Sequence, residues 1–234
     1  MLVKGSNPKA EVQFLQFLKT NQPLFQLELE GGLMAKLNQF LLLIRKRKGP
    51  SMKEQFWFGQ LVDALSLFPF FKDPDVVQLR RSDAIMDVGS GIGLPGVVLG
   101  LTLPTQLLIS NDISERLVAF QNDVINSLKI RNIKVWQTKK EWEPQLPIKV
   151  VVSRALAKAL SVLKIIMGLG LKHLVVMLVK GSNPKAEVQF LLRFGVAVGV
   201  SIVRMKVPIL NKRRHLIQIN CSASELNQQS NFKI

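Results

Sequence analysis

A glycine-rich turn follows a short apolar run in the stretch 85–96, which reads IMDVGSGIGLPG. Gly89, Gly91 and Gly93 lack a Cβ, so the backbone there can bend sharply and approach a bound molecule closely. Pro95 suits the first turn of a helix, because its missing N–H needs no partner in that position. The stretch therefore predicts a strand, a tight turn and a helix that together could cradle a nucleotide-type cofactor.

The glycines alone do not decide which cofactor such a turn would hold. Gly91, Gly93 and Gly96 also satisfy the G-x-G-x-x-G spacing of dinucleotide sites. Asp87 separates the alternatives, because a carboxylate at the end of the strand suits the cationic amino group of S-adenosylmethionine and would repel a pyrophosphate. We therefore expect S-adenosylmethionine, and a nicotinamide-dependent oxidoreductase is the weaker alternative.

A second carboxylate, Asp112, ends the next apolar run, about 20 residues past the turn. In an α/β nucleotide-binding fold, an acidic residue at this place accepts hydrogen bonds from ribose hydroxyls of the cofactor. The alternative is a local role, since either Asn111 or Asp112 could cap the helix that follows. Asp112 is thus a candidate cofactor ligand with a competing structural role.

These residues need a framework, and from residue 84 onward short apolar runs alternate with helical patterns. Apolar strands covered by helices on both faces are typical of a doubly wound, mostly parallel sheet. The last two runs are joined by a loop too short for a crossover helix, so they should pair as an antiparallel hairpin. The pattern predicts an α/β fold of the Rossmann-like class I methyltransferase type, with seven strands near 84–88, 107–112, 133–138, 149–155, 173–179, 197–207 and 214–220.

The sequence pattern divides the chain into three parts. These are an N-terminal helical extension at 1–82, the S-adenosylmethionine-dependent methyltransferase domain at 83–222 and a C-terminal tail at 223–234. In the extension, one amphipathic helix should end in the basic run 45–48. A second helix should span 52–67 and be closed by Pro69 and Pro74.

Residues 1–15 recur letter for letter at 177–191. A solenoid would need at least about three repeats, so this is a single duplication or an artefact of the gene model rather than an architecture. The second copy supplies the fifth expected strand. The first copy has no expected partner strand, so it should be poorly ordered or helical from Pro8 onward.

The chain is strongly basic, with 32 Lys and Arg against 16 Asp and Glu and a net charge of +16. Such an excess points to a polyanionic partner, with nucleic acid ahead of an anionic membrane surface. Two basic runs could meet RNA phosphates, although the first could instead cap its own helix and either could be a solvated surface. The runs are Arg45, Lys46, Arg47 and Lys48, and Lys212, Arg213 and Arg214.

Several classes of protein are disfavoured by the composition. The single cysteine, Cys221, cannot form an intramolecular disulfide, and His173 and His215 are too far apart for a zinc-type cluster, so we expect no metal. The apolar stretch 159–179 is interrupted by charges and glycines, which favours a buried helix and a strand over a membrane span. The N-terminus lacks the apolar run of a secretory signal. We expect a cytoplasmic monomer that binds no membrane.

Five motifs in this order resemble the RsmG family, also called glucose-inhibited division protein B, the bacterial guanine-N7 methyltransferases of small-subunit rRNA. That family shows DVGSGxGxPG, an acidic residue with a basic one four positions on, then SRA, a KG pair after the fifth strand, and RHL in the last strand. The matching residues here are Asp87 to Gly96, Asp112 with Arg116, Ser153-Arg154-Ala155, Lys180-Gly181 and Arg214-His215-Leu216. The resemblance covers about residues 55–220.

The resemblance implies roles for individual residues in binding S-adenosylmethionine. Gly89 and Leu94 would line the cofactor, Lys140 and Glu141 would flank its adenine, and Arg154 would complete the site. Lys140 and Glu141 could also be solvated loop charges, and Arg154 could simply pair with a carboxylate such as Asp87.

The implied substrate is 16S rRNA or the small ribosomal subunit, which Lys180 and the two basic runs would contact. Guanine N7 carries an in-plane lone pair and no proton, so no catalytic base is expected.

The chain departs from the family in two places. Before the first strand the family carries an NLT motif and His-x-x-Asp-Ser, whereas this chain has Gln60 in the histidine position and keeps only Asp63. Lys149 stands where an acid normally begins the fourth strand. These changes leave a second hypothesis open, a catalytically impaired RNA-binding module that acts in ribosome assembly.

Overall fold

A seven-stranded sheet forms the centre of the computed structural model, which describes residues 8–28, 30–48, 54–138, 146–171, 174–181, 184–193, 199–208 and 213–221. Its strand order is β3-β2-β1-β4-β5-β7-β6. The first five strands are parallel, and β7 runs antiparallel between β5 and β6. The strands are β1 Ala84–Val88, β2 Leu107–Asp112, β3 Ile133–Gln137, β4 Ile148–Arg154, β5 Leu174–Lys180, β6 Gly199–Met205 and β7 Arg214–Cys221. The expected fold class and the antiparallel hairpin are confirmed.

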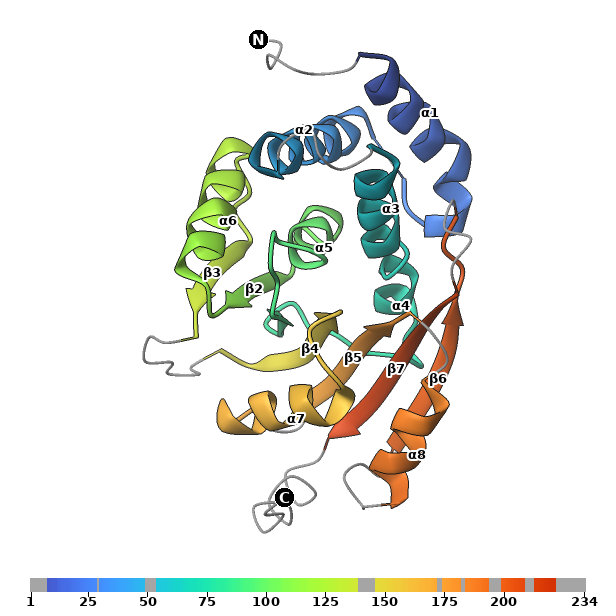
Figure 1. Cartoon of the computed structure of the whole chain (residues 1–234), viewed down its shortest axis with the longest axis vertical. Coiled ribbons are helices and arrows are strands. Elements are labelled where there is room, and N and C mark those ends of the chain that lie inside the picture. The colour runs from blue at the N-terminus through green and yellow to red at the C-terminus, as the bar shows by residue number, and fades with distance from the viewer. Residues whose placement is uncertain are drawn as a thin grey trace.

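Helices cover both faces of this sheet (Figure 1). Alternate residues of each central strand point to opposite sides, as in β1, where Ile85 joins one hydrophobic core and Met86 joins the other. The helices after the strands are α5 Gly96–Thr102, α6 Glu115–Ser127, α7 Ala159–Gly168 and α8 Lys185–Arg193. Burial on both faces explains why these strands read as continuous apolar runs.

The N-terminal helices share the core that lies on the α5 and α6 side of the sheet. They are α1 Pro8–Phe25, α2 Gly31–Lys48, α3 Glu54–Leu65 and α4 Phe68–Lys72. Phe14 of α1 is fully buried and stacks on Phe58 of α3, with ring centroids 4.9 Å apart. The first copy of the repeated segment was expected to be either poorly ordered or helical from Pro8, and it is helical from Pro8.

The second helix lies close to its expected range, but the expected role of Pro69 was wrong. α3 ends at Leu65, and Pro69 does not close a helix but lies in the first turn of α4. The missing N–H of a proline needs no partner in the first turn, so Pro69 is compatible with starting a helix as well as with ending one.

The apolar stretch 159–179 forms α7 and most of β5, as expected. None of the helices in the described ranges is long and apolar enough to cross a membrane.

Candidate cofactor and substrate site

The glycine turn after β1 lies at the carboxyl edge of the sheet, where open α/β sheets bind their ligands. Gly89 has a φ of 71°, a left-handed conformation that glycine adopts without strain. A Cβ on Gly89 would lie 2.5 Å from Cδ1 of Leu156, in the loop after β4. Glycine is therefore required here both by backbone conformation and by the close approach of Leu156.

Gln121 of α6 holds this turn in place. Its Nε2 donates to Ser90 Oγ and to the Gly91 carbonyl oxygen, both at 2.8 Å, and its Oε1 accepts from Ser110 Oγ at 2.5 Å. The side chain is fully buried. Sequence reasoning missed Gln121, although one signal was available: it is a polar residue on the face of α6 that also carries Val124 and Ile125.

Asp112 lies beside the same turn, where it was expected. Its Oδ2 accepts from the Gly91 N–H at 2.8 Å, and its Oδ1 accepts from the Ser114 N–H at 2.9 Å. Under the alternative interpretation, Asn111 or Asp112 would cap the next helix, but Ser114 occupies the N-cap position of α6. Each carboxylate oxygen keeps a second lone pair, so Asp112 can still accept from a ribose hydroxyl.

Asp87 is fully buried beneath the turn. Its Oδ2 accepts from the Gly96 N–H at 2.7 Å, while Oδ1 is buried and has no hydrogen-bond partner among the described residues. Burial raises the pKa of Asp87 from 3.8 to about 7, although the Gly96 N–H and the charge of Arg154 act in the opposite direction. Asp87 is thus a carboxyl group with one unused acceptor at the carboxyl end of β1.

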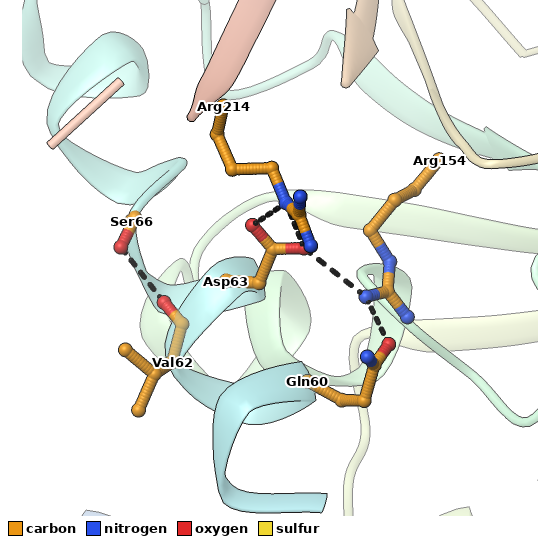
Figure 2. A network of polar contacts seen from close by, with 6 residues as sticks. All are labelled: Gln60, Val62, Asp63, Ser66, Arg154 and Arg214. Atoms are coloured by element: carbon orange, nitrogen blue, oxygen red, sulfur yellow. Dashed lines mark hydrogen bonds and ion pairs between the residues drawn. The ribbon is translucent and has the colours of Figure 1, made fainter. Parts of the chain in front are cut away.

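A network of two arginines and one aspartate lies at the carboxyl end of β4 (Figure 2). Asp63 of α3 is 3% exposed and pairs with Arg154 Nη1 at 3.4 Å and with Arg214 Nε at 3.1 Å. Gln60 Oε1 also accepts from Arg154, at 2.5 Å. The carboxylate partner of Arg154 is therefore Asp63, and not Asp87 as the alternative interpretation suggested.

These side chains line a cavity of about 310 Å³, together with Ala155, Ala157, Lys180 and Gly181. The loop after β4 separates the cavity from the glycine turn. Ala155 and Ala157 line the cavity, whereas Leu156 between them covers Gly89. Ser153 Oγ donates to the Val88 carbonyl oxygen at 2.9 Å and so fixes the end of β4 to that of β1. The arginine cavity and the glycine turn are thus neighbours at one edge of the sheet.

Comparison with known proteins identifies the family. A family model for rRNA small subunit methyltransferase G matches residues 27–220. The chain belongs to this family. The ribosomal RNA small subunit methyltransferase G of Burkholderia ambifaria (strain MC40-6) is 33% identical over 176 residues, which cover 71% of this chain and 72% of that protein. The one of Burkholderia vietnamiensis (strain G4 / LMG 22486) is 34% identical over 70% of this chain and 71% of that protein.

Solved structures agree on the fold. The methyltransferase domain of METTL16 superposes with a TM-score of 0.52 at 12% identity, covering 94% of this chain and 98% of that one. Human methyltransferase 10 domain containing protein gives 0.51 at 15% identity, covering 67% and 80%. The expectations of family, of a class I methyltransferase fold and of an S-adenosylmethionine-dependent rRNA methyltransferase are confirmed.

In this rRNA methyltransferase, the described residues at the glycine turn fit S-adenosylmethionine. Oδ1 of Asp87 has no partner among the described residues and could accept from a cationic amino group, and a Cβ placed on Gly91 would meet no atom within 4 Å, so the turn is open there. Leu94 is buried in the core shared with α5 and α6. Lys140 and Glu141 lie outside the described residues.

Two of the predicted RNA-contacting residues make contacts within the protein. Within the described part of the chain, the guanidinium of Arg47 stacks over Phe120, 4.7 Å from the ring centroid, and donates to the Arg116 carbonyl oxygen of α6 at 3.2 Å. Lys180 Nζ donates to the Ala157 carbonyl oxygen at 2.6 Å and to Glu187 Oε1 at 3.0 Å.

The remaining members of the two basic runs differ in exposure. Arg45 is half-buried, whereas Lys46 and Arg213 are exposed. The side chain of Lys48 and the whole of Lys212 lie outside the described part.

Proposed function

We propose that this chain transfers a methyl group from S-adenosylmethionine to N7 of a guanine in 16S rRNA. The observation that carries the proposal is the loop Ala155–Ala157, which has the glycine turn on one side and the arginine cavity on the other. A nucleotide in that cavity would lie next to the place where the turn holds the methyl donor. Membership in the rRNA small subunit methyltransferase G family supports the same reaction.

The chain needs to supply little acid–base chemistry for this transfer. When bound, S-adenosylmethionine supplies an electrophilic methyl group. Guanine N7 has a lone pair in the plane of the base and no proton, so no residue has to act as a base. The protein would contribute orientation, with the guanidinium groups of Arg154 and Arg214 holding the RNA, and exclusion of water by the loop at Leu156.

The cofactor would be held by the carboxylates and by the backbone of the turn. We assign Asp87 to the amino group, Asp112 to the ribose and Lys140 and Glu141 to the adenine. Gly89, Gly91, Gly93 and Leu94 would form the floor of the site. RNA phosphates would meet the two basic runs and Lys180, whose combined charge suits a polyanion.

The test uses unmodified 16S rRNA transcribed in vitro and assembled small subunits that lack the modification. Each is incubated with tritiated S-adenosylmethionine, and labelled nucleosides are separated after digestion. Label in 7-methylguanosine is the expected result. Label in any other nucleoside, or none in either substrate, contradicts the proposal.

The second candidate is an RNA-binding module without turnover, which Lys149 and Gln60 favour because both depart from the family pattern. Calorimetry separates the two candidates. RNA binding without any heat from S-adenosylmethionine would support the binding module, whereas heat from both ligands would support the enzyme.

For the setting of this activity we propose the cytoplasm, where ribosomal RNA is modified, and action as a monomer. We also propose that residues 83–222 form the methyltransferase domain, 1–82 its helical extension and 223–234 a tail. Sedimentation of the pure protein at micromolar concentration tests the oligomeric state, and a dimer would contradict it.

A further inference from the structure

A second cavity, of about 550 Å³, opens between α7 and α8. Its apolar lining includes Leu160 of α7 and Phe190 and Leu191 of α8, and its polar lining includes Lys158, Lys180 and Glu187. None of these residues has a role in the cofactor site described above, apart from the RNA contact proposed for Lys180.

The position of this cavity connects it to the proposed reaction. It lies at the carboxyl ends of β4 and β5, the edge at which sheets of this kind bind ligands. Lys180 and Gly181 line it and also line the arginine cavity, so the two cavities adjoin. A chain that occupies the arginine cavity can therefore continue into the cavity between α7 and α8.

Phe190 offers this cavity an aromatic surface. Its side chain is 39% exposed, although a buried position would remove more apolar surface from water. The same eight residues, PKAEVQFL, begin α1, where the corresponding Phe14 is fully buried. The exposure of Phe190 is therefore set by its place in the fold and not by its local sequence.

The charges of the lining favour a nucleic acid over an apolar peptide. Glu187 Oε1 is already engaged by Lys180 Nζ and by the Ala159 N–H, so its charge is largely neutralised. Lys158 at the start of α7 is exposed and adds positive charge at the rim. An exposed aromatic ring beside an exposed lysine is a usual combination for an unpaired base, which stacks on the ring while its phosphate meets the cation.

We propose that the cavity between α7 and α8 binds an unpaired base of the RNA substrate that neighbours the nucleotide in the arginine cavity. The base stacks on Phe190 and packs against Leu160, and its phosphate lies at Lys158. This inference rests on the proposed function, because it assumes an RNA substrate. It adds a subsite that would select substrates in which the target guanine and its neighbour are both unstacked.

The test compares Phe190→Ala with Leu192→Ala. Leu192 is 48% exposed on the same helix but does not line the cavity, so it controls for loss of an exposed apolar side chain. Binding of the 16S rRNA transcript is measured by filter retention, and binding of S-adenosylmethionine by calorimetry. Phe190→Ala should weaken RNA binding about 5- to 150-fold, as loss of one stacked base does, with unchanged cofactor affinity. Leu192→Ala should change neither quantity, and Phe190→Trp should retain RNA binding.

Lys158→Ala provides a second measurement. It should lower the slope of log K against log salt concentration by about 1, the change expected for one lost phosphate contact. Equal RNA affinities for Phe190→Ala, Leu192→Ala and the unchanged protein would overturn the subsite. The subsite would also be overturned if Phe190→Ala weakened binding only to assembled subunits and bound stripped rRNA normally. The cavity would then hold a ribosomal protein.

The failure of this inference is distinguishable from that of the proposed function. If the unchanged protein methylates guanine N7 and the Phe190 variants bind RNA normally, only the subsite fails. If Phe190→Ala weakens RNA binding while no guanine is labelled, the subsite stands and the reaction fails. Phe190→Ala and Leu192→Ala should unfold at the temperature of the unchanged protein. If Phe190→Ala is unstable, the salt dependence of Lys158→Ala decides, and an unchanged slope overturns the subsite.

Discussion

Arg214 donates from Nε to both carboxylate oxygens of Asp63, at 3.1 and 3.2 Å, although the two residues are 151 positions apart. The contact joins α3, one of the N-terminal helices, to β7, the last strand along the chain. Because Asp63 also pairs with Arg154, one buried carboxylate holds two guanidinium groups side by side at the edge of the arginine cavity (Figure 2).

Replacing this carboxylate should destabilise the protein. Asp63→Asn leaves two partly buried arginines next to each other without a counter-charge, which should lower the free energy of unfolding by about 3–5 kcal/mol. Urea denaturation measures the loss. Asp75→Asn removes the same charge from an exposed position and should change the stability by less than about 0.5 kcal/mol. Similar values for the two variants would show that the network contributes nothing to stability.

The Gln121 contacts should stabilise the glycine turn. Gln121→Leu leaves the buried hydroxyls of Ser90 and Ser110 and the half-buried Gly91 carbonyl without this partner. We therefore expect the free energy of unfolding to fall by about 1–3 kcal/mol and S-adenosylmethionine to bind more weakly. Asn122→Leu is the control, since Asn122 is the exposed neighbour on α6. Calorimetric titration of both variants measures the cofactor affinity. An unchanged affinity in Gln121→Leu would refute the role of Gln121 in holding the glycine turn for the cofactor.

Gly89 and Gly91 should respond differently to alanine. Both have positive φ, so both substitutions carry a backbone cost of about 1–2 kcal/mol. Only at Gly89 does the new Cβ also meet Leu156, which should add about 1–3 kcal/mol. Thermal or urea unfolding without cofactor measures both. Leu156→Ala in the Gly89→Ala background should remove the extra loss, and its persistence would contradict the contact.

Asp87 should make stability and cofactor binding depend on pH. Folding raises its pKa from 3.8 to about 7. Between these two pH values the carboxyl group is protonated in the folded state and ionised in the unfolded state. The stabilisation due to this proton is present below pH 4 and is lost as the pH rises through about 7. Relative to Asp87→Asn, the unchanged protein should lose up to about 4 kcal/mol between pH 4 and 8.

The affinity for S-adenosylmethionine should change in the opposite direction. The ionised form of Asp87 attracts the cationic amino group, so the affinity should rise as the pH increases through about 7. Asp87→Asn should bind more weakly and show a flat profile in that range. An unchanged profile in Asp87→Asn would mean that Asp87 does not face the amino group.

Phe14 should matter for stability and not for the cofactor. Phe14→Ala removes a fully buried ring, which should cost about 3–5 kcal/mol in urea denaturation, whereas Val12→Ala on the exposed side should cost little. Deleting residues 1–15 should likewise destabilise the protein but leave cofactor affinity unchanged in the molecules that remain folded. A large loss of affinity would show that α1 supports the site.

Local sequence was enough to predict the glycine turn, the carboxylates at the ends of β1 and β2 and the strands themselves. Their signals lie within a few residues, in apolar runs and in glycine spacing. The partners of Arg154 and the hydrogen bonds of Gln121 to the glycine turn were not predictable in this way. Apart from the hydrogen bond between Gln121 and Ser110, their contacts join residues that are about 30 to 94 positions apart, and only folding brings these residues together.

The repeated segment shows most clearly which features are determined by local sequence and which by tertiary packing. The letters KAEVQFL are helical in both copies, within α1 from Pro8 onward and within α8 from Lys185 onward, so helix formation here is a property of the sequence itself. Which side of that helix is buried is not. Among the repeated residues, Phe14 is the fully buried one in α1, whereas Val188 and Leu191 are buried in α8 and Phe190 is exposed. Identical residues meet different neighbours, because α1 packs on α2 and α3 while α8 packs on α7 and the sheet. Tertiary packing alone decides which apolar side chains leave water, and thereby leaves one phenylalanine in the core and its copy at the wall of a cavity.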